Sequence, residues 1–372
     1  MQNSKVIYIS RAVFPNKSAN SVHLMKMSQA ISRNFRDVTL IGLKEQKNRI
    51  IKKEIFENYD INSDFNLKLI SMPKRGIWIY LLIYVFFWLN FQSRKNKIIY
   101  SREPLIIFLS LFLGFKAILE SHDFFESKSK RNIEKKIFKH KNFLKLIVIS
   151  NALKNDYLMY FKIIPNIEVH HDGADIINLN SFNNFKWTGR KDVLQVGYFG
   201  HLYKGRGVEI IIDAAHKLNN FDFHIFGGLD SDINRYKSQP LSSNIYFHGF
   251  KQQKDLPFLR SKCDILLMPY QKKLSLYKSD RSTAKWMSPM KLFEYMSSKK
   301  AIVSSDIPVL REILNDQNSI LVKPDDLLGW INAIISLYDK KLRNKLACNA
   351  YSDFIENYTW DKRATSIFSN LQ

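Results

Sequence analysis

The chain has 372 residues, 45% of them hydrophobic and 24% charged, which excludes an intrinsically disordered protein and leaves room for two domains. Its two cysteines, Cys263 and Cys348, are too few for a disulfide framework and match no metal-ligand spacing, so we expect a reducing compartment. The net charge is +23, and +16 of it lies in residues 1–150, which hold 27 Lys and Arg against 11 Asp and Glu.

This uneven positive charge predicts an anionic partner for the first part of the chain. No helix-turn-helix, zinc-finger or RNA-binding signature accompanies it, so nucleic acid is not expected as a partner. The densest basic run is 128–145, and six aromatic residues in the same half favour an anionic membrane surface: Trp78, Tyr80, Tyr84, Phe86, Phe87 and Trp88. A lysine-rich surface that reflects only genome composition is the alternative.

The N-terminus runs directly into a strand-like segment and shows no signal peptide. Two apolar runs, 77–89 and 105–115, are each too short to cross a bilayer alone. We therefore expect a cytoplasmic protein in which both runs form buried helices.

Strand-like and helix-like segments alternate through the first half of the chain. Strands are expected at 6–10, 38–43, 97–100, 117–120 and 146–150, and helices at 21–34 and 77–91. This alternation predicts a parallel sheet wrapped by helices, with ligands at the carboxyl ends of its strands.

Residues 176–190 are rich in asparagine and lack periodicity, which indicates an interdomain linker. The alternation then restarts, with strands expected at 193–199, 222–226, 245–247, 265–268 and 301–304, a helix at 207–218 and further helices from 325 onward. We therefore predict an α/β fold of two similar units that face each other across a cleft. The predicted domains are 1–180 and 181–350, followed by a C-terminal helix at 351–372 that packs back towards the first domain.

A glycine-rich loop, 200–207, joins a strand to a helix at the start of the second predicted domain. Glycines let backbone N–H groups approach phosphate oxygens closely, and Lys204 and Arg206 add positive charge to the same loop. Many α/β turns need glycine for steric reasons alone, so the loop by itself is weak support for a phosphate site.

The segment 288–312 carries the strongest functional signal in the sequence. Ser288 and Pro289 predict a helix N-terminus, with Glu294 one to two turns further on and Glu312 on a second helix. Free N–H groups at such an N-terminus bind anions, and a nearby carboxylate binds sugar hydroxyls. Together with the glycine-rich loop, the segment suits a nucleotide diphosphate.

Seven segments, taken in this order, resemble the retaining glycosyltransferases of family 4. They span nearly the whole chain and are 19–27, 100–102, 120–122, 149–153, 172–175, 200–207 and 288–312. The resemblance implies the GT-B architecture, which consists of two facing Rossmann-like domains with parallel sheets and an interdomain cleft.

The resemblance also implies roles for individual residues. Glu294 matches the second glutamate of the family's Glu-x7-Glu motif, which holds the ribose of the donor. Lys204 and Arg206 match basic residues beside the diphosphate, and His122 matches a histidine near the transferred sugar; these four form the implied catalytic set. The other implied donor-binding residues are Asn20, Ser21, Gly200, Gly205, Ser288, Pro289, Met290, Lys291, Leu292 and Glu312.

The sequence departs from the family pattern at two positions. Trp286 stands where the first glutamate of the motif is expected, so the identity of the sugar cannot be carried over. Tyr198 stands where relatives often have arginine, which leaves Arg206 or Lys291 to supply the charge. Apart from the resemblance, His122 is better explained as a buried histidine with a satisfied ring.

The resemblance implies a retaining transferase that moves a sugar from a nucleotide-sugar to a growing, lipid-linked cell-surface glycan, such as lipopolysaccharide, capsule or exopolysaccharide. The enzyme would lie peripherally at the inner face of a bacterial plasma membrane. No cofactor or metal is expected, because cations and helix dipoles can stabilise the departing diphosphate. The alternatives are a nucleotide-sugar epimerase of the same architecture and a non-catalytic binder of anionic polymer.

Overall fold

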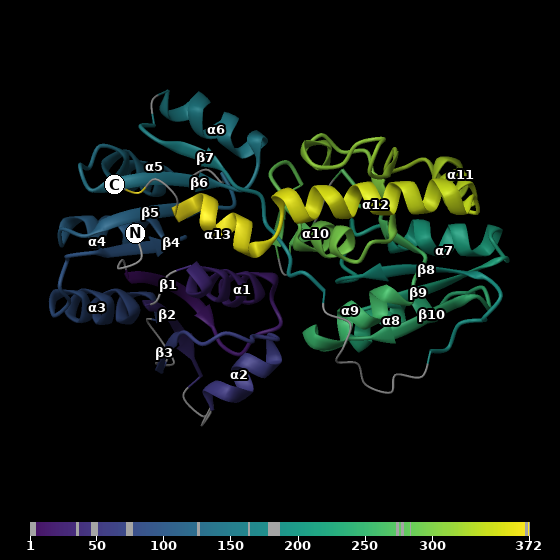
Figure 1. Ribbon diagram of the computed structural model, residues 1–372, viewed down its shortest axis with the longest axis horizontal. Coiled ribbons are helices and arrows are strands. Elements are labelled where there is room, and N and C mark those ends of the chain that lie inside the picture. The colour runs from purple at the N-terminus through teal and green to yellow at the C-terminus, as the bar shows by residue number, and fades with distance from the viewer. Residues whose placement is uncertain are drawn as a thin grey trace. The chain divides into compact units, whose positions relative to one another are not determined.

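The computed structural model describes residues 5–34, 37–45, 51–71, 77–124, 127–162, 164–177, 187–272, 275–276, 279–282, 284–368 and 371. The chain divides into two compact units (Figure 1). The first unit joins Met1–Asp172 to Trp360–Gln372, and the second is Gly173–Thr359. Of the predicted linker, 178–186 lies outside the described residues.

The first unit contains a seven-stranded parallel sheet of order β3-β2-β1-β4-β5-β6-β7. Its strands are β1 (Lys5–Val13), β2 (Asp37–Lys44), β3 (Asn66–Ser71), β4 (Lys97–Ser101), β5 (Lys116–Ser121), β6 (Phe143–Val148) and β7 (Ile167–Val169). Its helices are α1 (Ala19–Asn34), α2 (Lys52–Asn58), α3 (Ile77–Asn90), α4 (Pro104–Phe112), α5 (Lys128–Phe138), α6 (Asn151–Phe161) and α13 (Trp360–Phe368).

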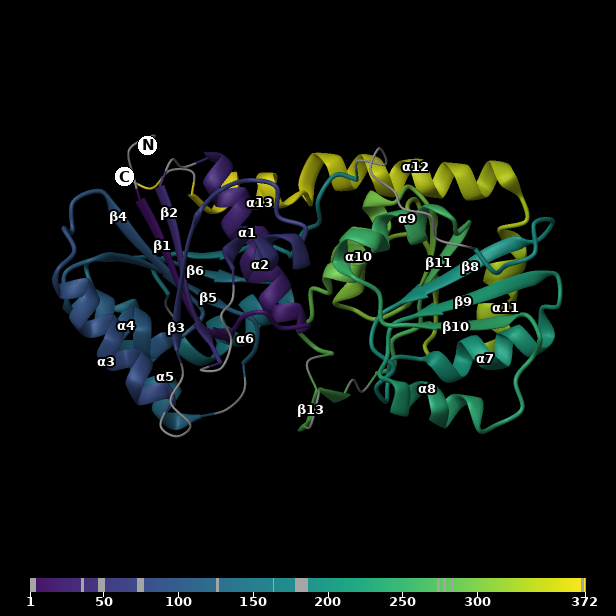
Figure 2. The ribbon, with the colours of Figure 1, turned by 90° about the horizontal axis from the view of Figure 1, so that it is seen from below.

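Helices cover both faces of this sheet, which explains why its central strands are mostly buried. In β5, for example, every residue after Lys116 is buried. Figure 2 shows α3, α4 and α5 on one side of the sheet and α1 on the other. The C-terminal helix α13 packs against α1, so residues 360–372 belong to the first unit, whereas 351–359 belong to the second.

The second unit contains a six-stranded parallel sheet of order β10-β9-β8-β11-β14-β15. Its strands are β8 (Leu194–Phe199), β9 (Phe221–Phe226), β10 (Ile245–Gly249), β11 (Ile265–Met268), β14 (Ala301–Ser305) and β15 (Ile320–Val322), and a separate hairpin joins β12 (Ser275–Leu276) to β13 (Ser279–Ser282). Its helices are α7 (Val208–Lys217), α8 (Asp230–Lys237), α9 (Leu256–Ser261), α10 (Met290–Ser297), α11 (Leu327–Ser336) and α12 (Lys340–Asn357), with 3-10 turns η1 (Gln253–Asp255) and η2 (Leu310–Glu312).

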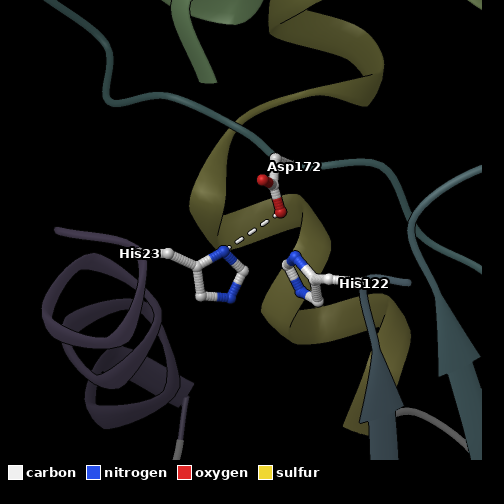
Figure 3. Close-up of side chains that lie close together, drawn as sticks. All are labelled: His23, His122 and Asp172. Carbon is white, nitrogen blue, oxygen red and sulfur yellow. Dashed lines mark ion pairs between the residues drawn. The ribbon is translucent and has the colours of Figure 1, made fainter. Parts of the chain in front are cut away.

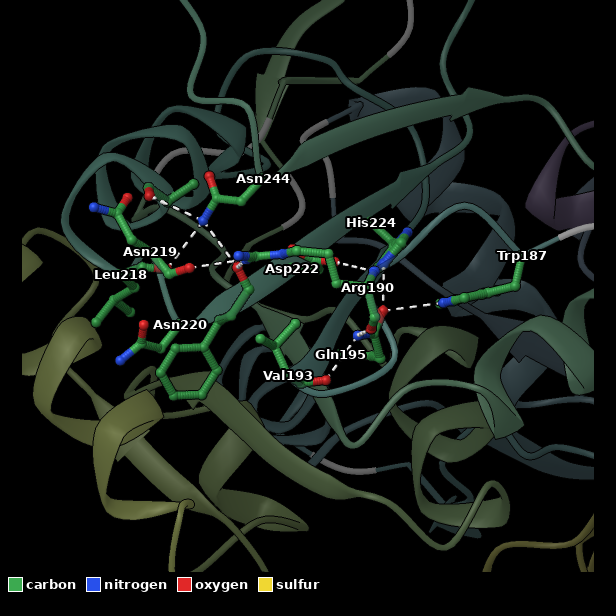
Figure 4. A network of polar contacts seen from close by, with 12 residues as sticks. Trp187, Arg190, Val193, Gln195, Leu218, Asn219, Asn220, Asp222, His224 and Asn244 are labelled. Atoms are coloured by element: carbon green, nitrogen blue, oxygen red, sulfur yellow. Dashed lines mark hydrogen bonds and ion pairs between the residues drawn. The ribbon is translucent and has the colours of Figure 1, made fainter.

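Arg190, near the start of the second unit, forms hydrogen bonds to the sheet of that unit (Figure 4). Its backbone N–H and its guanidinium Nε donate to the carboxylate of Asp222 at 2.6 and 2.9 Å, and Asp222 is wholly buried in β9. The amide nitrogen of Asn244 closes the turn between α7 and β9, where it lies 3.2, 2.9 and 2.9 Å from the carbonyl oxygens of Ala215, Leu218 and Phe221.

The predicted alternation of strands and helices is confirmed, but two details of the segment 288–312 were wrong. Pro289 occupies the N-cap position and α10 begins one residue later, at Met290, without a side-chain cap. Glu312 lies in the single 3-10 turn η2 and not in a second α-helix. The helix stops because Asn315 and Asn318 form a turn directly after it, in which the Asn315 N–H donates to the Asn318 side chain at 2.9 Å.

Candidate functional site

Two glycines of the glycine-rich loop of the second unit lie close to other parts of the chain. Gly207, with φ +77°, is the N-cap residue of α7, and a Cβ there would lie 1.9 Å from the carbonyl oxygen of Pro269. At Gly200, with φ +153°, a Cβ would lie 2.6 Å from Nζ of Lys291. Both positions therefore require glycine, and the second one brings the loop against a lysine of α10.

Two cations of this unit share one aromatic ring. Nζ of Lys291 lies 5.0 Å from the centre of the Tyr270 ring and 4.0 Å from that of Tyr198, and Cζ of Arg206 lies 5.2 Å from the Tyr270 ring. Burial lowers the pKa of Lys291 well below its ordinary value, the charge of Arg206 lowers it further, and Glu294 opposes both.

This cluster of Arg206, Lys291, Tyr198 and Tyr270 is the cation pair of the second unit. The buried Nε of Arg206 has no hydrogen-bond partner among the described residues. Two neighbouring cations of this kind are stabilised by an anion that accepts hydrogen bonds from both. The first-turn N–H groups of Met290 and Lys291 have no acceptor within α10 and add a helix N-terminus to the same place.

Glu294 lies one turn into α10 and is oriented by two donors. Its Oε2 accepts from the guanidinium of Arg260 at 3.1 Å, and its Oε1 accepts from the amide of Gln253 at 3.2 Å. Arg260 is itself held by Ser298, whose Oγ accepts from Nε at 3.1 Å. The Glu294 side chain stays 19% exposed, so its oxygens can still accept hydrogen bonds from hydroxyl groups of a ligand.

The structure brings only some of the predicted donor residues to the cation pair. Lys204 is exposed on the loop and is not part of the pair. Leu292 is buried, and its N–H already donates to the carbonyl oxygen of Pro289 at 2.8 Å. Gly205, with φ +88°, accepts from the N–H of Gln271 at 2.9 Å. Ser288 is buried beside the start of α10.

Two further positions of interest lie apart from these contacts. Trp286, at the position of the missing glutamate, is buried, and Nζ of Lys285 lies 5.8 Å from its ring centre. Glu312 lies in η2. Burial and the charge of Asp353 raise the pKa of Tyr358, and the charge of Glu312 raises it further.

In the first unit, Glu120 is the centre of a buried ion-pair network. This wholly buried carboxylate is the last residue but one of β5. Its Oε1 accepts hydrogen bonds from Nε2 of His122 and from Arg102 at 3.2 Å, and it forms ion pairs with Nε2 of His23 and with Arg363, each at 3.3 Å. Burial alone would raise the pKa of Glu120, but Arg363, His23 and the histidine hydrogen bonds hold it well below its ordinary value.

His122 is a neutral hydrogen-bond acceptor in this network. Burial and the charge of Arg102 lower its pKa to about 4, and the ionised Glu120 fixes the proton on Nε2. Nδ1 is therefore left as an acceptor, and the side chain is 24% exposed, unlike a buried core histidine. Such a ring can accept a hydrogen bond from a sugar hydroxyl.

His23 connects this network to Asp172, as Figure 3 shows. Its Nδ1 lies 3.0 Å from Oδ1 of Asp172. Burial alone would raise the pKa of the Asp172 carboxyl, but the charge of His23 lowers it below its ordinary value. The donor atoms of His23, His122 and Asp172 lie within 4.8 Å of one another, and such ligands suit zinc. However, the Arg363 guanidinium lies 4.0 Å from Asp172, and its charge disfavours a dication there.

The remaining predicted residues of this unit lie at the start of α1. Oδ1 of Asn20 accepts from the Arg102 guanidinium at 2.6 Å, which ties Asn20 to the Glu120 network. Ser21 is buried, and its hydroxyl lies 2.8 Å from the carbonyl oxygens of Asn16 and Ser18, so it stabilises the helix start.

Sequence reasoning missed several members of both clusters. Tyr270 and Arg260 belong to no recognisable sequence motif. Each contacts a residue that is distant in the sequence, Lys291 and Glu294 respectively. His23 and Asp172 lie inside the resembling segments 19–27 and 172–175, so that signal was available. Arg363 reaches the network from α13, and its Nε also donates to the carbonyl oxygen of His171 at 2.8 Å.

Comparison with known proteins identifies the kind of domain in the second unit. Residues 193–340 match the family described as Glycosyl transferases group 1. Among curated protein sequences, none matches the chain.

Solved structures of low sequence identity share the fold over the whole chain. Alr3699/HepE of Anabaena, in complex with UDP, is 15% identical, with 99% of each chain covered and a TM-score of 0.71. A glycosyltransferase of Rickettsia africae ESF-5 is 14% identical, with 100% of each chain covered and a TM-score of 0.71. WaaG, a glycosyltransferase involved in lipopolysaccharide biosynthesis, is 12% identical over 98% of this chain and 100% of its own, with a TM-score of 0.65.

These similarities confirm the predicted GT-B fold, with one Rossmann-like parallel sheet in each unit. The family match and the fold together support a glycosyltransferase.

Proposed function

We propose that the protein is a retaining glycosyltransferase that moves a sugar from a nucleotide-sugar to a growing, lipid-linked cell-surface glycan. The observation that carries the proposal is the cation pair, in which Arg206 and Lys291 flank Tyr270 within the part that matches the glycosyltransferase family. A diphosphate has the charge and the acceptor oxygens that this pair requires. Structures of HepE contain UDP and UDP-glucose, so uridine nucleotides are the first donors to test.

The proposed mechanism needs no protein nucleophile. Arg206, Lys291 and the N–H groups at the start of α10 stabilise the charge that develops on the departing diphosphate, and each such donor contributes about 3 kcal/mol to a transition state. The departing phosphate oxygen takes the proton of the acceptor hydroxyl on the same face of the sugar, which retains the anomeric configuration. Because fixed cations neutralise the diphosphate, we expect transfer without a metal.

Two side chains are proposed to orient the donor. Glu294, held by Arg260 and Gln253, accepts hydrogen bonds from the ribose hydroxyls. His122 accepts a hydrogen bond from the transferred sugar through Nδ1. Orientation of this kind lowers the entropic part of the barrier.

The acceptor is proposed to be lipid-linked, with the enzyme placed peripherally at the inner face of the plasma membrane. The similarity to WaaG, which is involved in lipopolysaccharide biosynthesis, makes a lipopolysaccharide intermediate the first acceptor to test.

A thermal-shift series with UDP, GDP, ADP and CMP tests the donor site. A nucleotide that binds only the folded protein raises its melting temperature, and we expect the largest rise with UDP and none in Lys291→Met. Turnover of the matching nucleotide-sugar should then require an acceptor. Sugar epimerisation without acceptor would instead indicate an epimerase, and salt-sensitive polymer binding without any nucleotide effect would indicate an anionic-polymer binder.

A further inference from the structure

Helix α3 is apolar on all sides but only half covered. None of its residues, Ile77–Asn90, is charged. One stripe at a spacing of four residues, Leu81, Val85 and Leu89, is wholly buried. On the opposite side Ile79, Ile83 and Phe87 are 65, 49 and 60% exposed, and Phe91, the next residue at that spacing, is 86% exposed. The expectation that this apolar run is a buried helix is therefore wrong for half of its surface.

The neighbouring helix α4 also has an exposed aromatic side chain. α4 packs against α3 and leaves Phe112 74% exposed, although it buries Ile106, Ile107 and Leu111. Figures 1 and 2 both show α3 and α4 side by side, with α5 next to α4. Large exposed apolar side chains gathered on two adjacent helices indicate a binding partner.

Lysines outnumber acids on α5, the helix next to α4. The exposed ionisable side chains of α5 and the residues after it are Lys128, Lys135, Lys136, Lys139 and Lys141, whereas Glu134, the acid of α5, is buried against Arg131. Nζ of Lys136 lies 5.8 Å from the Phe108 ring of α4. Among the described residues between 77 and 150, the most exposed acid is Asp123, whose side chain is 35% exposed and whose Oδ1 lies 3.1 Å from Nζ of Lys130.

A lysine also lies on the other side of α3. Nζ of Lys68, in β3, lies 5.0 Å from the Trp88 ring and 5.6 Å from the Tyr84 ring. Arg94 and Lys95 are exposed just beyond Phe91. The apolar stripe is thus flanked by positive charge on both sides, as in helices that lie in the plane of a membrane interface.

We propose that α3, α4 and α5 form a docking face for the surface of an anionic lipid bilayer. The exposed stripe of α3 and Phe112 enters the boundary between headgroups and acyl chains, while the lysines of α5 meet lipid phosphates. A second copy of the chain would bring lysine rows together, and nucleic acid would leave the aliphatic stripe unused. No helix among the described residues is long and apolar enough to cross a bilayer, so the contact is interfacial.

This inference gives the proposed membrane location a surface, but it does not depend on the donor site. It is tested by lipid binding alone, without any sugar transfer. Its failure therefore leaves the proposed transfer reaction untouched, and failure of that reaction leaves the docking face in place.

The test is co-sedimentation of the full chain with vesicles of phosphatidylglycerol and phosphatidylcholine, compared with vesicles of phosphatidylcholine alone. We expect binding to the anionic vesicles that falls with salt. Ile83→Gln with Phe87→Gln should lower the partition coefficient about 100-fold or more, since each buried apolar side chain contributes about tenfold or more. Lys135→Gln with Lys136→Gln should lower it about fivefold for each lysine.

The second unit supplies matched controls. Leu328→Gln with Ile335→Gln removes two exposed apolar side chains of α11, and Lys340→Gln with Lys341→Gln removes two exposed lysines of α12. Neither pair should change the partition coefficient. Binding that is absent at low salt, or that the α11 pair lowers as much as the α3 pair, would overturn the proposal.

A second readout does not depend on loss of binding. A polarity-sensitive dye at Phe87→Cys, with Cys348→Ser to remove the exposed native thiol, should shift to the blue on anionic vesicles. The same dye at Leu328→Cys should not shift. A dye at Phe87→Cys that shifts instead with protein concentration, without lipid, would overturn the proposal in favour of a second copy of the chain.

Discussion

Nζ of Lys291 lies 4.0 Å from the centre of the Tyr198 ring, so a tyrosine of β8 supports a cation of α10. The ring face attracts the ammonium group by about 1–2 kcal/mol where water is excluded. That attraction keeps Lys291 in place but does not neutralise it, and Arg206 adds a second charge nearby. A bound diphosphate would neutralise both.

Lys291 should take up a proton when the donor binds. Burial and Arg206 depress the pKa of Lys291 in the unliganded protein, whereas a diphosphate favours the charged form, so binding should raise that pKa. The affinity should therefore fall as the pH rises above the depressed pKa, by at most about tenfold per pH unit. Calorimetry with a nucleotide-sugar, in buffers of different ionisation enthalpy, measures this uptake directly.

The matched variant for this experiment is Lys291→Arg, which stays charged at every accessible pH. It should bind without proton uptake and with a flat pH dependence. Uptake of the same size in Lys291→Arg would show that another group titrates.

Arg206 and Lys204 should differ in their effect on donor affinity. Arg206 belongs to the cation pair, and its buried Nε has no hydrogen-bond partner in the part of the chain that the structure describes, so Arg206→Ala should weaken UDP binding by about 2 kcal/mol, roughly 30-fold. Lys204 is exposed, so Lys204→Ala should cost less than about 1 kcal/mol. Isothermal titration measures both, with the exposed Lys217→Ala as the control. A larger loss for Lys204→Ala would place the phosphates at the loop tip instead.

Much of this site follows from sequence patterns, but its electrostatics does not. Gly200, Gly207 and Glu294 stand at fixed offsets from strand and helix ends, so local chain geometry predicts them. Lys291 was predicted as a donor residue, but its packing against Tyr270 depends on side chains 21 positions apart in the chain.

In the first unit, too, some site residues are predictable from the sequence and others are not. His122 follows a predictable strand, whereas Arg363 joins the Glu120 network from the last helix. No periodicity links residues so distant in the sequence, because their meeting depends on how α13 packs against α1. The depressed pKa of His122, which makes the ring an acceptor, arises from that folded environment as well.

Substitution of Glu120 should mainly lower the stability of the protein, whereas substitution of His122 should mainly lower its activity. Glu120 is wholly buried among two guanidiniums and two imidazoles, so Glu120→Gln removes the charge that both guanidiniums share and should cost about 3–5 kcal/mol of unfolding free energy. His122→Ala removes a partly exposed ring and should cost about 1 kcal/mol, while turnover falls at least about 100-fold. Urea unfolding and initial-rate assays measure the two effects. Full activity in a well-folded His122→Ala would rule out a contact with the sugar.

The pair His224 and His248 should make the second unit sensitive to acid. Nε2 of His224 donates to Oε1 of Gln195 at 2.8 Å, because the Gln195 amide nitrogen donates to the carbonyl oxygens of Arg190 and Val193 (Figure 4). Nδ1 of His224 is therefore an acceptor, and His248 donates to it through Nε2 at 2.9 Å. Both rings are neutral in this arrangement.

Burial and the neighbouring His248 lower the pKa of His224 from 6.5 to about 3, and burial and Lys251 lower that of His248 from 6.5 to about 4. Between these values and 6.5, the unfolded chain binds more protons than the folded one, so stability falls as the pH falls below about 6.5. The slope is at most about 1.4 kcal/mol per pH unit for each histidine. In His248→Gln the amide still donates to His224 but does not titrate, so the slope of unfolding free energy against pH should become shallower. Urea unfolding between about pH 7 and about pH 5 measures this slope. His216→Gln, at an exposed histidine, is the control. Equal slopes in His248→Gln and the native chain would contradict the assignment.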